Sequence, residues 1–125
     1  MKTRSLLVAL ILALTPAPGA ARDYDAGLDA YGSGDYATAL REWRPLAEQG
    51  HAGAQYGLGL MYYNGEGVVQ DDPTAHMWLD MAAANGSEDA GKARDVVASR
   101  MTAEAISQSQ RRAWACMQSN YQDCN

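Results

Sequence analysis

The 125-residue sequence has no phenylalanine, only two cysteines and two histidines, and fewer basic than acidic residues, with ten Lys and Arg against fifteen Asp and Glu. His51 and His76 have no cysteine or carboxylate at ligand spacing, so we expect no bound metal and expect both side chains to face solvent. The acidic balance argues against nucleic acid and against anionic membrane surfaces as partners.

Motifs for catalysis and for nucleotide binding are also missing. No serine lies in the G-x-S-x-G turn of a hydrolase, and Gly57-x-Gly59 lacks the third glycine of a dinucleotide-binding loop. The paired carboxylates of the chain stand at predicted helix starts, where capping explains them. We therefore predict a non-enzymatic protein with no catalytic residues, no cofactor and no metal site.

The first 21 residues are predicted to be a signal peptide. Lys2 and Arg4 precede an apolar run over residues 6–14, and the small residues Ala20 and Ala21 suit cleavage. The run is shorter than the roughly 20 apolar residues that span a bilayer, so we expect no transmembrane anchor after processing. An uncleaved anchor is the alternative. Residues 22–125 have the size of one domain, which we expect to be periplasmic or secreted.

Residues 47–86 have the pattern of two helices joined by a glycine-rich turn. Ala47 and Gly50 return as Ala83 and Gly86 after 36 residues, a period typical of helical solenoids. Small and apolar residues recur at helical spacing in both halves. The residues that define the pattern are Ala54, Leu58, Gly59, Met61, Tyr62, Gly65, Gly67, Val68, Asp71, Ala75, Trp78, Ala82, Ala83 and Gly86.

These residues closely resemble the Sel-one-like repeat, a relative of the tetratricopeptide repeat. The resemblance implies an all-α fold of antiparallel helix-turn-helix repeats, stacked as a short right-handed α-solenoid. We place one complete repeat at about 51–86 and partial repeats at 22–50 and 87–125, which together give about six helices. Stacked helix pairs leave a concave face, lined by the first helix of each pair, that can hold a peptide or a protein segment.

Individual residues support this arrangement of helices. Gly57 and Gly59 each cost a helix about 1 kcal/mol relative to alanine, which indicates that a neighbouring helix approaches too closely for a Cβ atom. In the first helix, near residues 23–34, Tyr24, Leu28 and Tyr31 fall on one face. The predicted N-caps of the later helices are Asp35, Asp71 or Asp72, Ser87 and Thr102.

The two cysteines, Cys116 and Cys124, are expected to form a disulfide in an exported chain. Eight residues of unbroken helix would hold their Cα atoms about 12 Å apart, beyond the limit of roughly 7 Å for a bridge. The last helix should therefore stop and the chain turn back near residues 120–123, so that the bond staples the end of the solenoid. A redox pair is the alternative, but the C-x-x-C spacing is missing.

The leading functional hypothesis is an exported module that binds a protein or peptide of unknown identity on its concave face, as a monomer or weak oligomer. Its candidate contact residues are Gln55, Tyr56 and Tyr63, because both tyrosines lie off the buried stripe of Leu58. Two alternatives remain. Some exported proteins of the resembling family are described as binding or hydrolysing β-lactams, although those carry a cysteine pair in every repeat. The chain could also be a structural subunit that docks on copies of itself.

Overall fold

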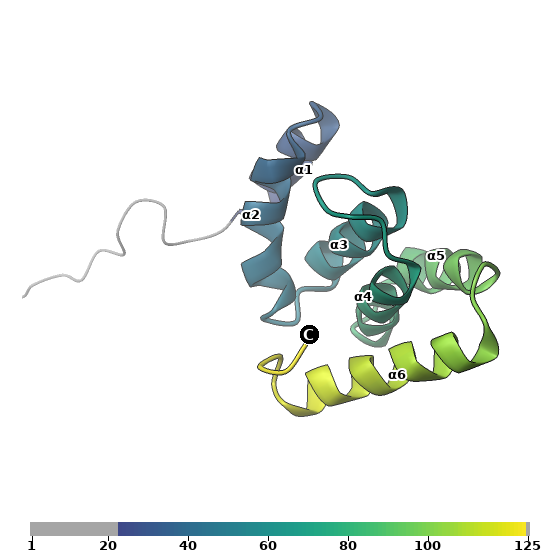
Figure 1. Cartoon of the computed structure of the whole chain (residues 1–125). Helices are drawn as coiled ribbons and strands as arrows, with labels where there is room; N and C mark the ends of the chain where they lie inside the picture. Colours follow the sequence, from purple (N-terminus) through teal and green to yellow (C-terminus); the bar gives the residue numbers. More distant parts are fainter. Residues whose placement is uncertain (1–22, 125) are drawn as a thin grey trace, which may run out of the picture.

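The computed structural model describes residues 23–124, and over this range the chain forms six α-helices and no strand (Figure 1). The predicted signal peptide lies outside the described residues. The helices are α1 (Tyr24–Gly32), α2 (Tyr36–Ala47), α3 (Ala52–Asn64), α4 (Asp72–Ala84), α5 (Glu88–Ala98) and α6 (Ala103–Gln118). Each helix from α1 to α5 packs against the next, and α6 packs across α4. The predicted all-α solenoid of about six helices is therefore confirmed.

Every helix begins at a residue whose side chain accepts a hydrogen bond from a backbone N–H of the first turn. The six N-caps are Asp23, Asp35, His51, Asp71, Ser87 and Thr102. At the exposed His51, Nδ1 accepts from the backbone N–H of Ala54 at 3.0 Å. Each of these bonds satisfies a donor that the helix cannot satisfy itself. The sequence predicted the caps at Asp35, Asp71, Ser87 and Thr102 but not the one at His51.

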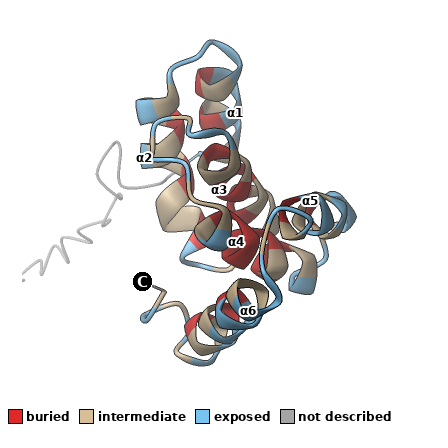
Figure 2. Ribbon diagram, turned by 45° about the vertical axis from the view of Figure 1, so that its right-hand side comes forward, coloured by how far each residue is buried: buried red, intermediate tan, exposed pale blue. Residues whose placement is uncertain are grey.

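The core lies where α2, α3 and α4 meet, and buried residues concentrate on α3 and α4 in the middle of the molecule (Figure 2). Trp43 of α2 is 2% exposed and its ring packs where a Cβ on Gly57 would stand, 2.6 Å from Cε3. A Cβ on Gly59 would lie 2.5 Å from Cγ of Leu79. The predicted close approach at both glycines is confirmed.

Two side chains lie differently from their prediction. His76 was expected to face solvent, but it is only 2% exposed. The middle of α4, residues 75–79, is buried throughout, because α3, α5 and α6 all pack against this helix. Leu28 shares a predicted face with Tyr24 and Tyr31 but is 44% exposed. The buried residues of α1 are Gly27 and Ala30, since the missing side chain of Gly27 admits the Trp43 ring.

Candidate binding face

The first helices of the three pairs, α1, α3 and α5, present equivalent positions. Helices α1 and α3 share the pattern Tyr-x-x-Gly-Leu-x-x-Tyr over residues 24–31 and 56–63, which are 32 residues apart. The glycines of this pattern also make equivalent contacts, since Gly27 faces Trp43 of α2 and Gly59 faces Leu79 of α4. Trp43 and Leu79 are themselves one repeat apart, so α1 and α3 turn the same side toward their second helices.

An aliphatic residue recurs on the solvent-facing side of these helices. Leu28 of α1 corresponds to Leu60 of α3, and Val96 of α5 follows Leu60 by 36 residues, the spacing of the N-caps His51 and Ser87. Leu28 is 44% exposed, Leu60 is half-buried and Val96 is 55% exposed. We call Leu28, Leu60 and Val96 the aliphatic row. The first helix of each pair thus keeps an aliphatic side chain at least partly accessible to solvent.

Between α3 and α5 the aliphatic row borders a small pocket of about 190 Å³. Its lining residues are Leu60, Tyr63, Leu79, Ala93, Val96 and Val97. Leu79 forms a fully buried floor, and the lining surface is apolar. The pocket has the size and chemistry to take one aliphatic side chain from a bound segment.

Charged side chains at the edges of this face contact two of its tyrosines. The guanidinium of Arg100 lies 4.1 Å from the ring centroid of Tyr63 and pairs with Asp72 at 2.6 Å. At the equivalent position of α1, Tyr31 donates a hydrogen bond to Glu66 Oε1 at 3.0 Å. Burial, followed by this hydrogen bond, raises the pKa of Tyr31 to about 12, so its hydroxyl stays a neutral donor. These contacts fix both tyrosines in place.

The three predicted contact residues have different positions. Tyr63 borders the pocket, and Tyr56 packs half-buried beside it on the same side of α3. Gln55 is not on this face: it is fully buried, its Nε2 donates to the carbonyl of Ala47 at 3.0 Å, and its Oε1 accepts from Asn85 Nδ2 at 2.9 Å. The prediction for Gln55 is corrected, because its amide supports the fold and cannot reach a partner from there.

Sequence reasoning missed Leu60 and Val96. A signal for Leu60 was present, because Tyr56, Leu60 and Tyr63 stand at i, i+4 and i+7 and so form a second apolar stripe on α3. Val96 had none, since its neighbours Arg94 and Asp95 interrupt the repeat pattern.

The cysteines lie away from this face. Cys116 and Cys124 form a disulfide with their Cα atoms 4.5 Å apart, as predicted. Helix α6 ends at Gln118, and the chain turns back through Asn120 and Tyr121, both with positive φ. The expected turn is therefore confirmed.

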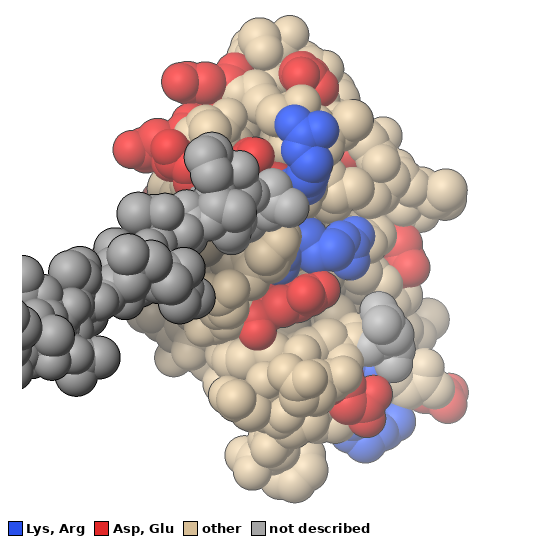
Figure 3. All heavy atoms as spheres, turned by 90° about the vertical axis from the view of Figure 1, so that its left-hand side faces the viewer, with Lys and Arg blue, Asp and Glu red and all other residues tan. Residues whose placement is uncertain are grey.

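Among residues 23–124, no group of three or more His, Cys, Asp or Glu side chains is placed to hold a metal ion. None of the helices in this range has the length and hydrophobicity to cross a bilayer. On the side shown in Figure 3, basic side chains are separated by neutral and acidic ones and form no continuous patch.

Comparison with known proteins finds a match to the central helix pair. The model of the Sel1 repeat matches residues 52–87. Two curated relatives, both named exopolysaccharide production negative regulator, come from Rhizobium leguminosarum bv. viciae and Rhizobium meliloti (strain 1021). They are 39% and 38% identical to this chain over 69 residues, which are 52% of this chain and 26% of each relative. The chain thus spans about a quarter of these relatives. No solved structure matches it.

Proposed function

Since residues 52–87 are a Sel1 repeat, we propose that this protein is a binding scaffold that holds a peptide or protein segment along α1, α3 and α5. The observation that carries the proposal is the aliphatic row, which ends at the apolar pocket between α3 and α5. The pocket is lined by apolar side chains of three helices, and an apolar hollow that is open to solvent is typical of a surface that a partner covers.

The contacts available to the partner are mainly apolar. Full burial of a Val or Leu side chain contributes about 1.5–3 kcal/mol, so covering the exposed parts of Leu28 and Val96 contributes roughly half of that for each. The pocket adds specificity, because it accepts an aliphatic side chain of the partner and excludes a charged one. Arg100 packs on Tyr63 at the edge of the pocket, and its charge is already paired with Asp72, so the selection of a partner there is mainly apolar.

The relatives' names suggest the setting. We propose that the protein acts non-enzymatically, as an adaptor or regulatory subunit. We further propose that it serves a cellular process related to exopolysaccharide production, for which those relatives are named. We also propose that residues 1–21 are removed on export and that the protein works in the periplasm or outside the cell. The disulfide suits an oxidising compartment.

The proposal is tested with a photo-reactive amino acid at position 96, on the pocket, and in a control at position 108. Gln108 is exposed on α6 and lies outside the pocket. We expect the same discrete protein to be trapped repeatedly from position 96 and not from position 108. With that protein purified, Val96→Asp should weaken binding at least tenfold, and Gln108→Ala on the exposed side of α6 should leave it unchanged. Equal trapping at both positions, or tight binding by Val96→Asp, would refute the proposal.

Self-association is a second candidate, and the exposure of Trp114 favours it. This side chain stands beside a groove of about 580 Å³ between α4, α5 and α6. Exposed tryptophans are enriched among residues that carry interface energy. Sedimentation would show a concentration-dependent dimer that Trp114→Ala abolishes, whereas a monomer at high concentration would exclude this candidate.

A further inference from the structure

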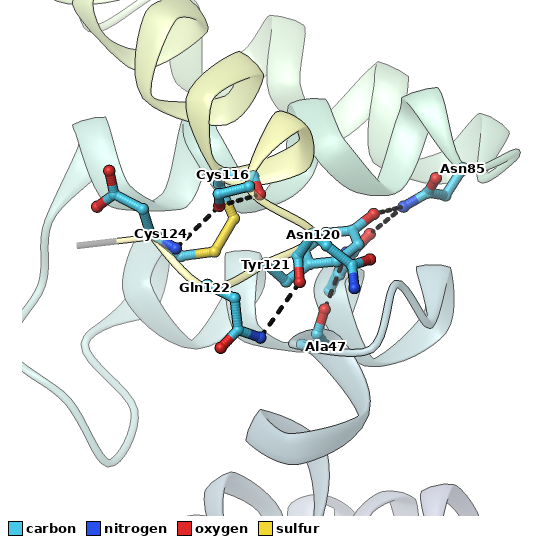
Figure 4. The surroundings of a disulfide bond; sticks show 10 residues. Ala47, Asn85, Cys116, Asn120, Tyr121, Gln122 and Cys124 are labelled. Atoms are coloured by element: carbon cyan, nitrogen blue, oxygen red, sulfur yellow. Dashed lines mark hydrogen bonds between the residues drawn. A yellow bond between two sulfur atoms is a disulfide. The ribbon is translucent and has the colours of Figure 1, made fainter.

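The loop that follows α6 is closed by the Cys116–Cys124 disulfide and folds back onto the solenoid (Figure 4). We call residues 116–124 the clasp. Within it, the backbone N–H of Tyr121 donates to the carbonyl of Cys116 at 2.8 Å. Asn120 and Tyr121 have φ values of 55° and 63°. Asparagine tolerates this left-handed region, whereas a tyrosine adopts it only when surrounding contacts hold it there. The disulfide supplies such a constraint.

Tyr121 contacts two turns that are far apart in the sequence. Its hydroxyl accepts a hydrogen bond from Asn85 Nδ2 at 2.9 Å. Its ring packs on Gly50, where a Cβ atom would lie 3.2 Å from the hydroxyl oxygen. Gly50 belongs to the turn between α2 and α3, and Asn85 to the turn between α4 and α5. These are the two turns at which one helix pair passes into the next.

The buried Gln55 connects the same turns from the inside. It donates to the carbonyl of Ala47 and accepts from Asn85, whose amide also reaches Tyr121. One continuous set of contacts therefore runs from Ala47 through Gln55 and Asn85 to Tyr121 and back to Gly50. Because Tyr121 and Gln55 both join the two turns, the angle between successive helix pairs depends in part on where the clasp holds Tyr121.

We propose that the clasp is a redox-dependent device that fixes this angle while the disulfide is intact and releases it when a dithiol reduces the bond. Cys116 is fully buried and Cys124 is half-buried, so the thiolate of the incoming dithiol attacks Sγ of Cys124. A mixed disulfide forms, and Cys116 leaves as a thiolate and takes up a proton. The second thiol of the reductant then displaces Cys124, which leaves two cysteine thiols and an oxidised reductant.

Loss of the disulfide frees the chain beyond α6 from the constraint that keeps Asn120 and Tyr121 at positive φ, and Tyr121 leaves the turns. Helices α3 and α5 begin directly after those turns, so their spacing, and with it the apolar pocket between them, becomes variable. This effect on binding rests on the proposed function, whereas the release of the turns does not.

Amide hydrogen exchange tests the clasp without any partner. Three equivalent hydrogen bonds close the turns of the chain: His51 N–H to Leu46 at 3.0 Å, Ser87 N–H to Ala82 at 3.0 Å and Asp35 N–H to Ala30 at 2.8 Å. The first two lie in the turns that Tyr121 contacts, and the third, between α1 and α2, is the internal control. Reduction should speed exchange at His51 and Ser87 at least tenfold and leave Asp35 unchanged.

Two variants separate the clasp from general loss of stability. Tyr121→Ala in the oxidised protein should reproduce the faster exchange at both turns, and Gln122→Ala, an exposed residue of the same loop, should not. The proposal is overturned if reduction leaves His51 and Ser87 unchanged, if Asp35 accelerates by the same factor, or if Tyr121→Ala has no effect. Because no partner is present, these outcomes are independent of the proposed binding function.

Discussion

The same substitution is expected to have opposite effects at two helical glycines, Gly59 of α3 and Gly91 of α5. In Gly59→Ala the new Cβ would lie 2.5 Å from Cγ and 2.6 Å from Cδ2 of Leu79, so the buried Leu79 side chain, which forms the floor of the apolar pocket, would have to shift. Overpacking of this kind costs about 1–3 kcal/mol, and the better helix propensity of alanine returns about 1 kcal/mol. The two terms together give a net loss of stability of up to about 2 kcal/mol.

Gly91 has space for the added methyl group. A Cβ there would lie 3.9 Å from Cβ of Ala83, an ordinary van der Waals distance. Gly91→Ala should therefore show the propensity gain alone and raise the unfolding free energy by about 0.5–1 kcal/mol.

Urea unfolding followed by far-ultraviolet circular dichroism measures both variants. In thermal unfolding, the midpoint temperatures of the two variants should also move apart, by roughly 4–8 °C for each kcal/mol of difference in stability in a domain of this size. If Gly59→Ala were as stable as the parent, the Gly59–Leu79 contact would not be the reason for the glycine. If Gly91→Ala were destabilised, helix propensity would not govern that site.

Three further predictions concern burial and cross-linking. Burial lowers the pKa of His76 below its ordinary value of 6.5, which favours the neutral imidazole in the folded protein. The unfolding free energy should therefore fall as pH drops from 7.5 to 5.5, and it should fall less steeply with pH in His76→Leu. Equal slopes in the two proteins would contradict this prediction. Trp114 is 67% exposed, so Trp114→Ala should change the unfolding free energy by less than about 0.5 kcal/mol. Trp43 is 2% exposed, so Trp43→Ala should lower it by about 3–5 kcal/mol. Urea unfolding measures both. Replacing both Cys116 and Cys124 by Ser should lower the unfolding free energy by about 2–3 kcal/mol, because the disulfide restricts the unfolded chain by closing a loop. An unchanged midpoint of urea unfolding would contradict this reasoning.

Part of the binding face could be predicted from the chain. Tyr63 was a candidate because it lies off the buried stripe of α3, and it does border the pocket. Gln55 was named beside it as a polar residue of the same helix and is buried, because its amide joins two turns that are distant in the sequence. Helical periodicity orders the residues around one helix, but it does not say how many neighbours that helix has. His76 was misplaced for this reason, since α4 is packed by three helices.

Interactions within a few residues were sufficient to place the helices, four of their six N-caps and the closed loop at the end of α6. Asp35, Ser87 and Thr102 cap helices through bonds that span three residues, and the Cys116–Cys124 spacing required a turn whatever the rest of the chain did. The tertiary structure alone decided which apolar side chains stay exposed and where the clasp docks. Both depend on contacts between helices of different pairs, whose relative positions come from packing and not from the local sequence.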